Sequence, residues 1–173
     1  MLNAVAALAL LWSLALPSDP RSAAATGVPY TEVLAAEAEA TAAMSAEAEA
    51  LMAEEPDWRL SARLYHAGGG GATGNDSLGC RPIALRTVAV DPNHVPRRTR
   101  LFIRETVGLP LPDGRTHDGF WYASDTGGAI RGAKIDLYTG HGRASMQPVM
   151  PLNMRTLTVV EAGRFEGCPP DWE

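Results

Sequence analysis

The chain has 173 residues, enough for one domain with a hydrophobic core plus additional segments, and too few for two domains of ordinary size. Its formal charge of −5 is uneven, because residues 1–75 hold three Arg and nine acidic residues, whereas residues 76–173 hold twelve basic and eleven acidic residues. No cluster of Lys and Arg marks a nucleic-acid-binding surface, so no nucleic acid partner is expected.

Residues 2–16 form an apolar run that is shorter than the roughly 20 residues a membrane-spanning helix needs. Pro17 and Pro20 follow the run, and the small residues 22–25 offer cleavage sites, so residues 1–25 are typical of a signal peptide. We therefore expect an exported protein, periplasmic or extracellular, without stable membrane insertion after cleavage. A buried helix or an uncleaved anchor is the alternative, because no basic residue precedes the run.

Residues 31–55 are nearly all Ala and Glu, a composition that predicts a helix ended by Pro56. The apolar positions form only a weak stripe, so this helix is expected to pack loosely or not at all. Residues 57–67 fit a further helical turn or a first strand, and we group residues 26–67 as one Ala/Glu-rich helical segment. The Gly-rich residues 68–76 are typical of a linker, which places the following domain at residues 77–173.

From Cys80 onward the sequence consists of short β-like runs separated by Pro, Gly and Asp. Strands are predicted at residues 83–90, 99–106, 120–124, 134–138 and 156–161. About six short strands without regularly alternating helices predict a mainly β fold, a small β-barrel.

Cys80 and Cys168 bracket the β region almost from end to end. In an oxidising compartment, a disulfide between them would close a long loop and stabilise the fold by up to about 4 kcal/mol. Two unrelated buried thiols are the alternative. Two cysteines cannot form a structural zinc site and no His pair has ligand spacing, so no metal or cofactor is expected. His94, His117 and His141 lie in Pro- or Gly-rich contexts and are predicted in exposed loops.

Asp136 is the most informative residue of the chain, because Ile135 and Leu137 flank it. Strand alternation places these two apolar residues on one face and Lys134, Asp136 and Tyr138 on the other. A carboxyl group held beside apolar surface has its neutral form favoured, as a general acid near neutral pH requires. Lys134 would oppose this effect if it pointed into the same site.

Asp125 follows the strand predicted at residues 120–124 and precedes Gly127 and Gly128, which allow close backbone approach. Its carboxylate is expected to accept backbone N–H groups and to stay ionised. Two carboxyl groups in different environments are the signature of a division between acid and base.

Residues 79–163 resemble the 3D domain, named for three aspartates, which is the C-terminal catalytic domain of membrane-bound lytic transglycosylase A and of smaller secreted relatives. The matching segments are Gly79-Cys80, Leu85–Pro92, Val95-Pro96, Asp125–Gly132 and Ile135–Gly140. The resemblance implies a six-stranded double-psi β-barrel and peptidoglycan glycan strands as the partner. It places Asp136 at the catalytic acid/base and Asp125 and Asp91 at the other two aspartates. Candidate substrate-binding residues are Gly127, Gly128, Arg131, Lys134 and Tyr138.

The resemblance therefore implies a lytic transglycosylase, which cleaves the MurNAc–GlcNAc bond and leaves 1,6-anhydromuramyl ends. Asp136 would protonate the leaving oxygen and then accept the proton of the muramyl C6 hydroxyl, which attacks C1. Raising the pKa of an Asp from about 3.9 to near 7 requires roughly 4 kcal/mol.

Three other functions fit parts of the sequence. A non-catalytic peptidoglycan-binding module would require only the fold and its binding surface, and no catalytic acid. Asp125-Thr126-Gly127 is also the triplet of aspartic proteases, which need a second copy. The three aspartates together could hold a divalent metal. Structural alternatives exist for single residues: Asp91 as a turn residue, Asp125 as a helix cap and Asp136 as a satisfied buried carboxylate. The oligomeric state is not indicated.

Overall fold

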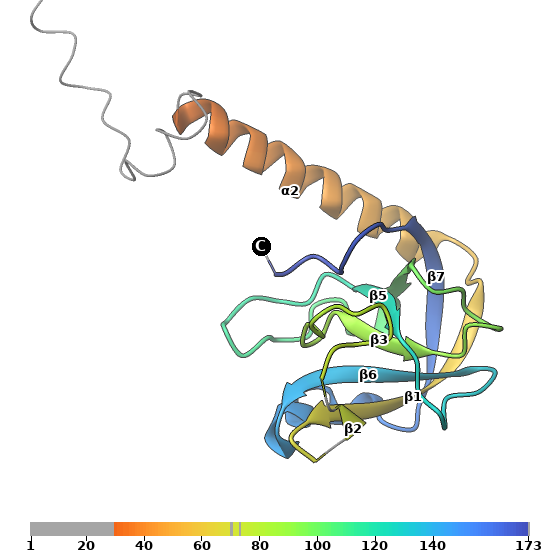
Figure 1. Cartoon of the computed structure of the whole chain (residues 1–173). Helices are drawn as coiled ribbons and strands as arrows, with labels where there is room; N and C mark the ends of the chain where they lie inside the picture. Colours follow the sequence, from red (N-terminus) through yellow and green to blue (C-terminus); the bar gives the residue numbers. More distant parts are fainter. Residues whose placement is uncertain (1–29, 70, 73, 173) are drawn as a thin grey trace, which may run out of the picture. The chain divides into compact units, whose positions relative to one another are not determined.

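The computed structural model describes residues 30–172 except residues 70 and 73 (Figure 1). The predicted signal peptide, residues 1–25, lies outside the described residues. Among the helices that are described, none combines the length and the apolar character that crossing a membrane requires. The described residues divide into two units, with the boundary between Met44 and Ser45.

The predicted Ala/Glu-rich helix is present as α2, Tyr30–Ala53, and it ends three residues before Pro56. Its exposed Leu34, Met44 and Met52 agree with the weak apolar stripe. The end of the helix, which belongs to the second unit, is packed: Leu51 is buried in a cluster with Phe102, Phe120 and Val160. The guanidinium of Arg104 donates to the carbonyl oxygen of Leu51 at 3.1 Å and so caps the last turn.

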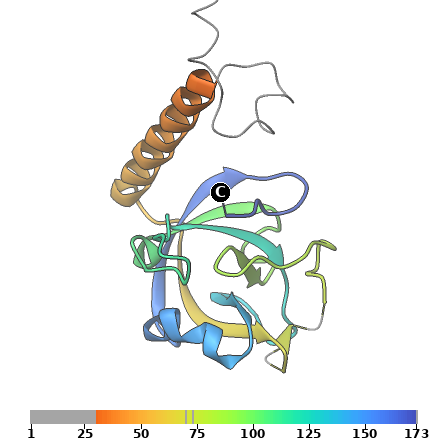
Figure 2. The ribbon, with the colours of Figure 1, turned by 90° about the vertical axis from the view of Figure 1, so that its left-hand side faces the viewer.

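The second unit is built on seven strands that form one mixed sheet. Six of them pair in a closed ring in the order β1-β6-β3-β5-β4-β7, and β7 pairs back onto β1 (Figure 2). The pairs β1–β6 and β3–β5 are parallel, and the other pairs within the ring are antiparallel. The strands are β1 (Trp58–Ala67), β2 (Gly71–Ala72), β3 (Thr87–Val90), β4 (Thr99–Ile103), β5 (Phe120–Asp125), β6 (Lys134–His141) and β7 (Thr156–Arg164), with 3-10 helices η1 (Arg104–Thr106) and η2 (Arg143–Leu152). The prediction of a mainly β fold is confirmed.

Residues 58–67 are the strand β1, not part of a helical segment. β1 pairs with β6 on one side and with β7 on the other, so it closes the ring. The Gly-rich residues 68–76 therefore connect two parts of the ring, and the β domain predicted to begin at residue 77 omits one of its strands. Alternation along β1 is visible in the sequence but was ambiguous, because its Ala and Leu residues also occur commonly in helices.

The interior of the ring is filled by side chains that alternate along the strands. Five of these side chains have no solvent exposure and belong to one cluster: Leu60, Ala62, Val88, Ile135 and Leu137. Their neighbours along the same strands consequently face outward. The predicted alternation of β6, with Ile135 and Leu137 on the inner face, is present.

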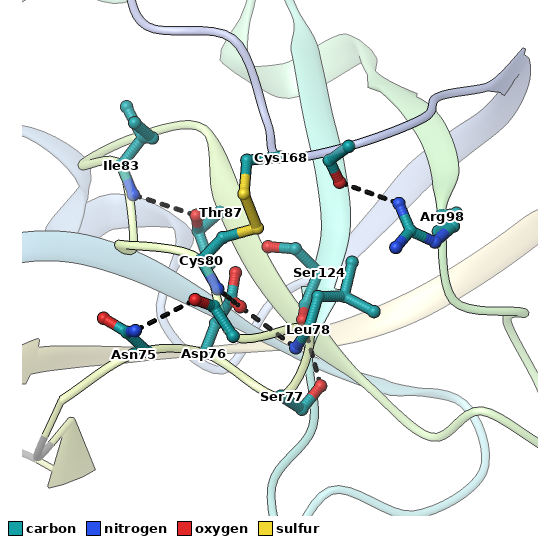
Figure 3. The surroundings of a disulfide bond; sticks show 12 residues. Asn75, Asp76, Ser77, Leu78, Cys80, Ile83, Thr87, Arg98, Ser124 and Cys168 are labelled. Carbon is teal, nitrogen blue, oxygen red and sulfur yellow. Dashed lines mark hydrogen bonds between the residues drawn. A yellow bond between two sulfur atoms is a disulfide. The ribbon is translucent and has the colours of Figure 1, made fainter.

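The predicted disulfide joins Cys80 to Cys168, which are 88 residues apart in the sequence (Figure 3). The prediction that His117 lies in an exposed loop is wrong, because this residue is 1% exposed. His117 Nε2 donates to the Leu85 carbonyl oxygen at 2.8 Å, and Nδ1 accepts from Gly119 N at 2.9 Å. Burial lowers the pKa of His117 to about 4, so the ring is neutral and serves as a structural bridge. His94 is exposed in a loop as predicted; His141 is exposed too, but it is the last residue of the strand β6 and not a loop residue.

Candidate active site

Four residues on four neighbouring strands form a row across the outer face of the ring. Asp136 of β6 is paired with Arg63 of β1 on one side and with Ala89 of β3 on the other. Ala89 is paired in turn with Asp125, the last residue of β5. Residues paired in this way present their side chains on the same face. The sheet therefore brings Asp136 and Asp125 together, with one small residue between them.

Asp136 lies in an apolar part of this face. Tyr65, Ala89, Ile130 and Tyr138 form a buried cluster there, outside the core of the ring. Oδ1 of Asp136 is buried and has no hydrogen-bond partner among the described residues. Burial raises the pKa of Asp136 to about 6; the charge of Arg63 opposes this shift and the charge of Asp125 adds to it. A carboxyl group in this state can give up a proton and take one back near neutral pH.

Arg63 is the cation nearest in register to Asp136, and its own strand holds it. Its Nη1 donates to Ser61 Oγ at 3.0 Å and to the Ala62 carbonyl oxygen at 2.8 Å. No ion pair joins it to Asp136 within the described part of the chain. Lys134, which was expected to oppose the shift only if it pointed into the site, is exposed. The charge that opposes the pKa shift of Asp136 therefore comes from a residue that the sequence did not single out.

Asp125 differs from Asp136 in that both of its oxygens have partners. Oδ1 accepts from the backbone N–H of Thr126 at 2.8 Å and from that of Ser77 at 3.1 Å. Oδ2 accepts from the hydroxyl of Tyr65 at 2.8 Å. Burial, followed by the charge of Asp125, raises the pKa of Tyr65, so the phenol keeps its proton as a donor. The predicted backbone donors to Asp125 are present.

The donor Ser77 is positioned by a short loop that the disulfide anchors. Oδ1 of Asp76 accepts from the backbone N–H of Leu78 at 3.0 Å and of Cys80 at 2.8 Å. Figure 3 shows this turn beside the bond to Cys168, with Ser77 reaching toward β5. The hydroxyl of Ser77 donates to the Ser124 carbonyl oxygen at 2.9 Å, which attaches the loop to that strand. The disulfide thus supports the surroundings of Asp125 as well as the fold.

Asp91, the third aspartate, does not join the row. It is 7% exposed and lies just after β3. Oδ2 accepts from the backbone N–H of Gly132 at 2.8 Å, and Oδ1 accepts from that of Asn93 at 3.1 Å. These bonds, that of Gly132 first, lower the pKa of Asp91. Its geometry matches the structural alternative, because it fixes a turn and ties down the segment between β5 and β6.

That segment, residues 126–133, carries three of the predicted binding residues. A Cβ atom on Gly127 would lie 2.7 Å from Ile130 Cγ1, whereas one on Gly128 would meet nothing within 4 Å. Gly127 therefore lets Ile130 fold over the apolar face. Arg131 is exposed, and its Nη1 donates to the Ile130 carbonyl oxygen at 3.1 Å. Tyr138, another predicted binding residue, lies on β6 and is 8% exposed, with its ring centre 5.1 Å from that of Tyr65.

Sequence reasoning missed Arg63, Tyr65 and Ser77. The first two lie on β1, where Leu60, Ala62 and Leu64 alternate with Ser61, Arg63 and Tyr65. That period of two was the signal available, and it was assigned to a helical segment. Ser77 donates to Asp125 through its backbone N–H, and such a contact leaves no signal in the sequence. Across the described ranges, no group of three or more His, Cys, Asp or Glu residues could hold a metal ion, so the three aspartates do not form a metal centre.

Residues 86–148 match the model of the family described as 3D domain, which confirms the resemblance drawn from the sequence. No curated protein sequence matches the chain.

Similar solved structures include MltA from E. coli with bound chitohexaose, which is 23% identical with a TM-score of 0.36 over 55% of this chain and 30% of that one. The lytic transglycosylase LtgG of Burkholderia pseudomallei is 22% identical, with a TM-score of 0.35 over 53% of this chain and 28% of that one. A membrane-bound lytic murein transglycosylase from Agrobacterium tumefaciens is 26% identical, with a TM-score of 0.34 over 54% and 26%. This chain therefore spans less than a third of each of these longer proteins.

Proposed function

We propose that this protein is a peptidoglycan lytic transglycosylase in which Asp136 is the general acid and base. The observation that carries the proposal is the state of Asp136: its Oδ1 is buried without a partner, and its pKa is raised to about 6. The residue lies inside the segment that matches the 3D domain. Few structural roles require a carboxyl group in this condition, because an unsatisfied buried oxygen costs free energy.

The proposed reaction uses one carboxyl group twice. Neutral Asp136 gives its proton to the glycosidic oxygen as the C1–O bond of the MurNAc residue breaks, and GlcNAc leaves as an alcohol. The resulting carboxylate then takes the proton of the muramyl C6 hydroxyl, whose oxygen bonds to C1. The carboxyl group ends protonated as it began, and the product is a 1,6-anhydro sugar. The scheme differs from that of two-carboxylate hydrolases, because the substrate itself supplies the nucleophile.

Asp125 has an electrostatic part in this scheme. Its three hydrogen bonds hold it in place, and its charge raises the pKa of Asp136 across Ala89. A like charge nearby favours the neutral acid before reaction and stabilises the oxocarbenium-like positive charge that develops on the sugar during it. Asp91 contributes indirectly by holding the segment that carries Ile130.

We also propose that the ring is a double-psi β-barrel, as the resemblance to the 3D domain implies. The closed order of six strands and the two parallel pairs, β1–β6 and β3–β5, support this topology. The outer face of such a barrel beside Asp136 is where glycan would bind.

An aspartic-type protease is not favoured by the geometry. Such an enzyme needs two carboxyl groups that share one proton. Among the described residues, the partners of the Asp125 carboxylate are Thr126, Ser77 and Tyr65, and none is a second carboxyl group.

The test is mass spectrometry of purified sacculi incubated with the protein. Wild type is expected to release 1,6-anhydromuropeptides, and Asp136→Asn is expected to release none while remaining folded by circular dichroism. Glu166→Gln changes an exposed acid outside the row and serves as the matched control, with wild-type activity expected. Full activity of Asp136→Asn would refute the assignment of the acid. Binding of sacculi without new anhydro ends would identify a non-catalytic binding module, for which soluble chitohexaose is a second probe.

A further inference from the structure

A cavity of about 480 Å³ lies beside the candidate active site and has no role in the proposed reaction. It is found where β6 passes Tyr138 and reaches Gly140. Its other walls come from residues 81–85, residues 111–113, the helix η2 and Trp172. A volume of this size is within the range of small-molecule binding sites.

The walls of the cavity are built before any ligand binds. The indole Nε1 of Trp172 donates to the Ala84 carbonyl oxygen at 2.9 Å, and the guanidinium carbon of Arg86 lies 3.6 Å from the centre of the Trp172 ring. The disulfide at Cys80 fixes the start of the neighbouring wall and, through Cys168, the segment that leads to Trp172. A preorganised wall of this kind lowers the entropy cost of binding.

The cavity combines apolar walls with one available cation. Pro82, Ile83, Leu111 and Pro148 supply apolar surface. Arg81 stands at the rim and pairs with Asp171 at 3.2 Å, but the two side chains are 79% and 73% exposed. An ion pair so open to solvent contributes little and is easily exchanged for another partner.

Tyr138 lines the same cavity as Arg81. Burial raises the pKa of Tyr138 and the charge of Arg81 lowers it, so the two side chains are near enough to interact electrostatically. The acid on the rim, Asp113, is compensated by Arg115 at 2.8 Å. A guanidinium next to a phenolic hydroxyl is the donor set that recognises a carboxylate.

The position of the cavity decides which carboxylate fits. Tyr138 follows Asp136 by two residues on β6, so their side chains share a face and their Cα atoms lie about 7 Å apart. The cavity is therefore within reach of a substituent on the sugar at the reaction centre or on its immediate neighbour. In peptidoglycan, the muramyl sugar carries a peptide that bears free carboxylates.

We propose that this cavity binds the peptide substituent of the glycan strand, with a peptide carboxylate on Arg81 and the Tyr138 hydroxyl. The inference rests on the proposed function and adds to it a preference for strands that carry peptides. Bare glycan leaves the cavity empty and is cleaved more slowly.

The test compares intact sacculi with sacculi whose peptides an amidase has removed, and the readout is the rate at which anhydro ends form. Arg81→Gln removes one charge-assisted contact to the peptide carboxylate. We therefore expect it to slow cleavage of peptide-bearing strands roughly five- to tenfold and to leave cleavage of bare strands unchanged. Arg155→Gln, an exposed arginine outside the cavity, is the matched control and should change neither rate. Equal rates of wild type on the two substrates would overturn the inference while leaving the proposed function intact.

A binding measurement separates the inference from catalysis. Muramyl dipeptide should bind wild type more tightly than MurNAc does, and Arg81→Gln should remove that difference. If wild type forms no anhydro ends on either substrate, the proposed reaction is refuted. The difference in affinity between the two probes then still tests whether the cavity binds peptide. Equal affinity of wild type for the two probes, or an unchanged difference in Arg81→Gln, would refute the cavity as a peptide site.

Discussion

Replacement of Asp136 by Asn is expected to stabilise the protein at neutral pH and to have little pH-independent effect. The substitution keeps the shape of the side chain and removes the charge. In the folded state the pKa of Asp136 is about 6, against 3.8 for an unperturbed Asp. A shift of about two units corresponds to roughly 3 kcal/mol, and partial exposure of the side chain reduces the expected effect to about 1–2 kcal/mol.

The sign follows from the linkage between proton binding and folding. Below pH 3.8 the carboxyl group is neutral in the folded and the unfolded states, so its ionisation costs the fold nothing. Between pH 3.8 and about 6 only the unfolded state releases the proton, so wild-type stability falls as pH rises. Above about pH 6 the penalty is complete. Asp136→Asn escapes it, so its advantage grows across this window.

Urea denaturation of wild type and Asp136→Asn at pH 4 and pH 7.5 measures this advantage. The difference between the two proteins should be about 1–2 kcal/mol larger at pH 7.5 than at pH 4. Comparison of two pH values cancels any constant effect of the amide, and Glu166→Gln controls for the loss of a negative charge as such. The same difference at both pH values would show that the fold does not perturb this carboxyl group, and the basis of the proposed acid would be lost.

Three further substitutions test the supports of the site. Tyr65→Phe removes the hydroxyl donor to Asp125 and should lower the free energy of unfolding by about 1–2 kcal/mol in urea denaturation, whereas no change would mean that water replaces the phenol. Cys80→Ser should lower it by about 2–4 kcal/mol, and reduction of wild type with dithiothreitol should reproduce the loss. Gly127→Ala forces Ile130 to move and should cost about 1–3 kcal/mol, while Gly128→Ala stays within about 0.5 kcal/mol; equal costs would contradict the contact with Ile130.

The sequence predicted those features that depend on local pattern. The apolar residues Ile135 and Leu137 on either side of Asp136 predicted which face of β6 points into the core. The Ala/Glu composition predicted the helix α2. The chain has two cysteines, so only one intramolecular disulfide was possible, and it was predicted. Each of these conclusions needs only the neighbours of a residue or a count, so no knowledge of strand order was required.

The features that the sequence did not predict depend on partners far along the chain. The hydrogen bond from Tyr65 to Asp125 joins residues 60 positions apart in the sequence, and that from His117 to Leu85 joins residues 32 positions apart. His117 stands beside Gly119 in a stretch that has the composition of an exposed loop. The Trp121 ring that stacks on it is close in sequence, but the Trp172 ring that packs against its edge comes from the end of the chain. Strand pairing decides which residues face Asp136, and pairing order is a property of the whole ring.

The condition of Asp136 is a balance in which the placement of Arg63 is decisive. An opposite charge in direct contact lowers the pKa of a carboxyl group by one to three units, about as much as the pKa of Asp136 is raised overall. Arg63 lies directly opposite on the adjacent strand, yet its guanidinium is hydrogen-bonded to Ser61 Oγ and to the Ala62 carbonyl oxygen. With the cation turned along its own strand, burial and the charge of Asp125 prevail, and the carboxyl group retains its proton to about pH 6. The unusual acid therefore depends as much on what restrains its neighbour as on the apolar side chains around it.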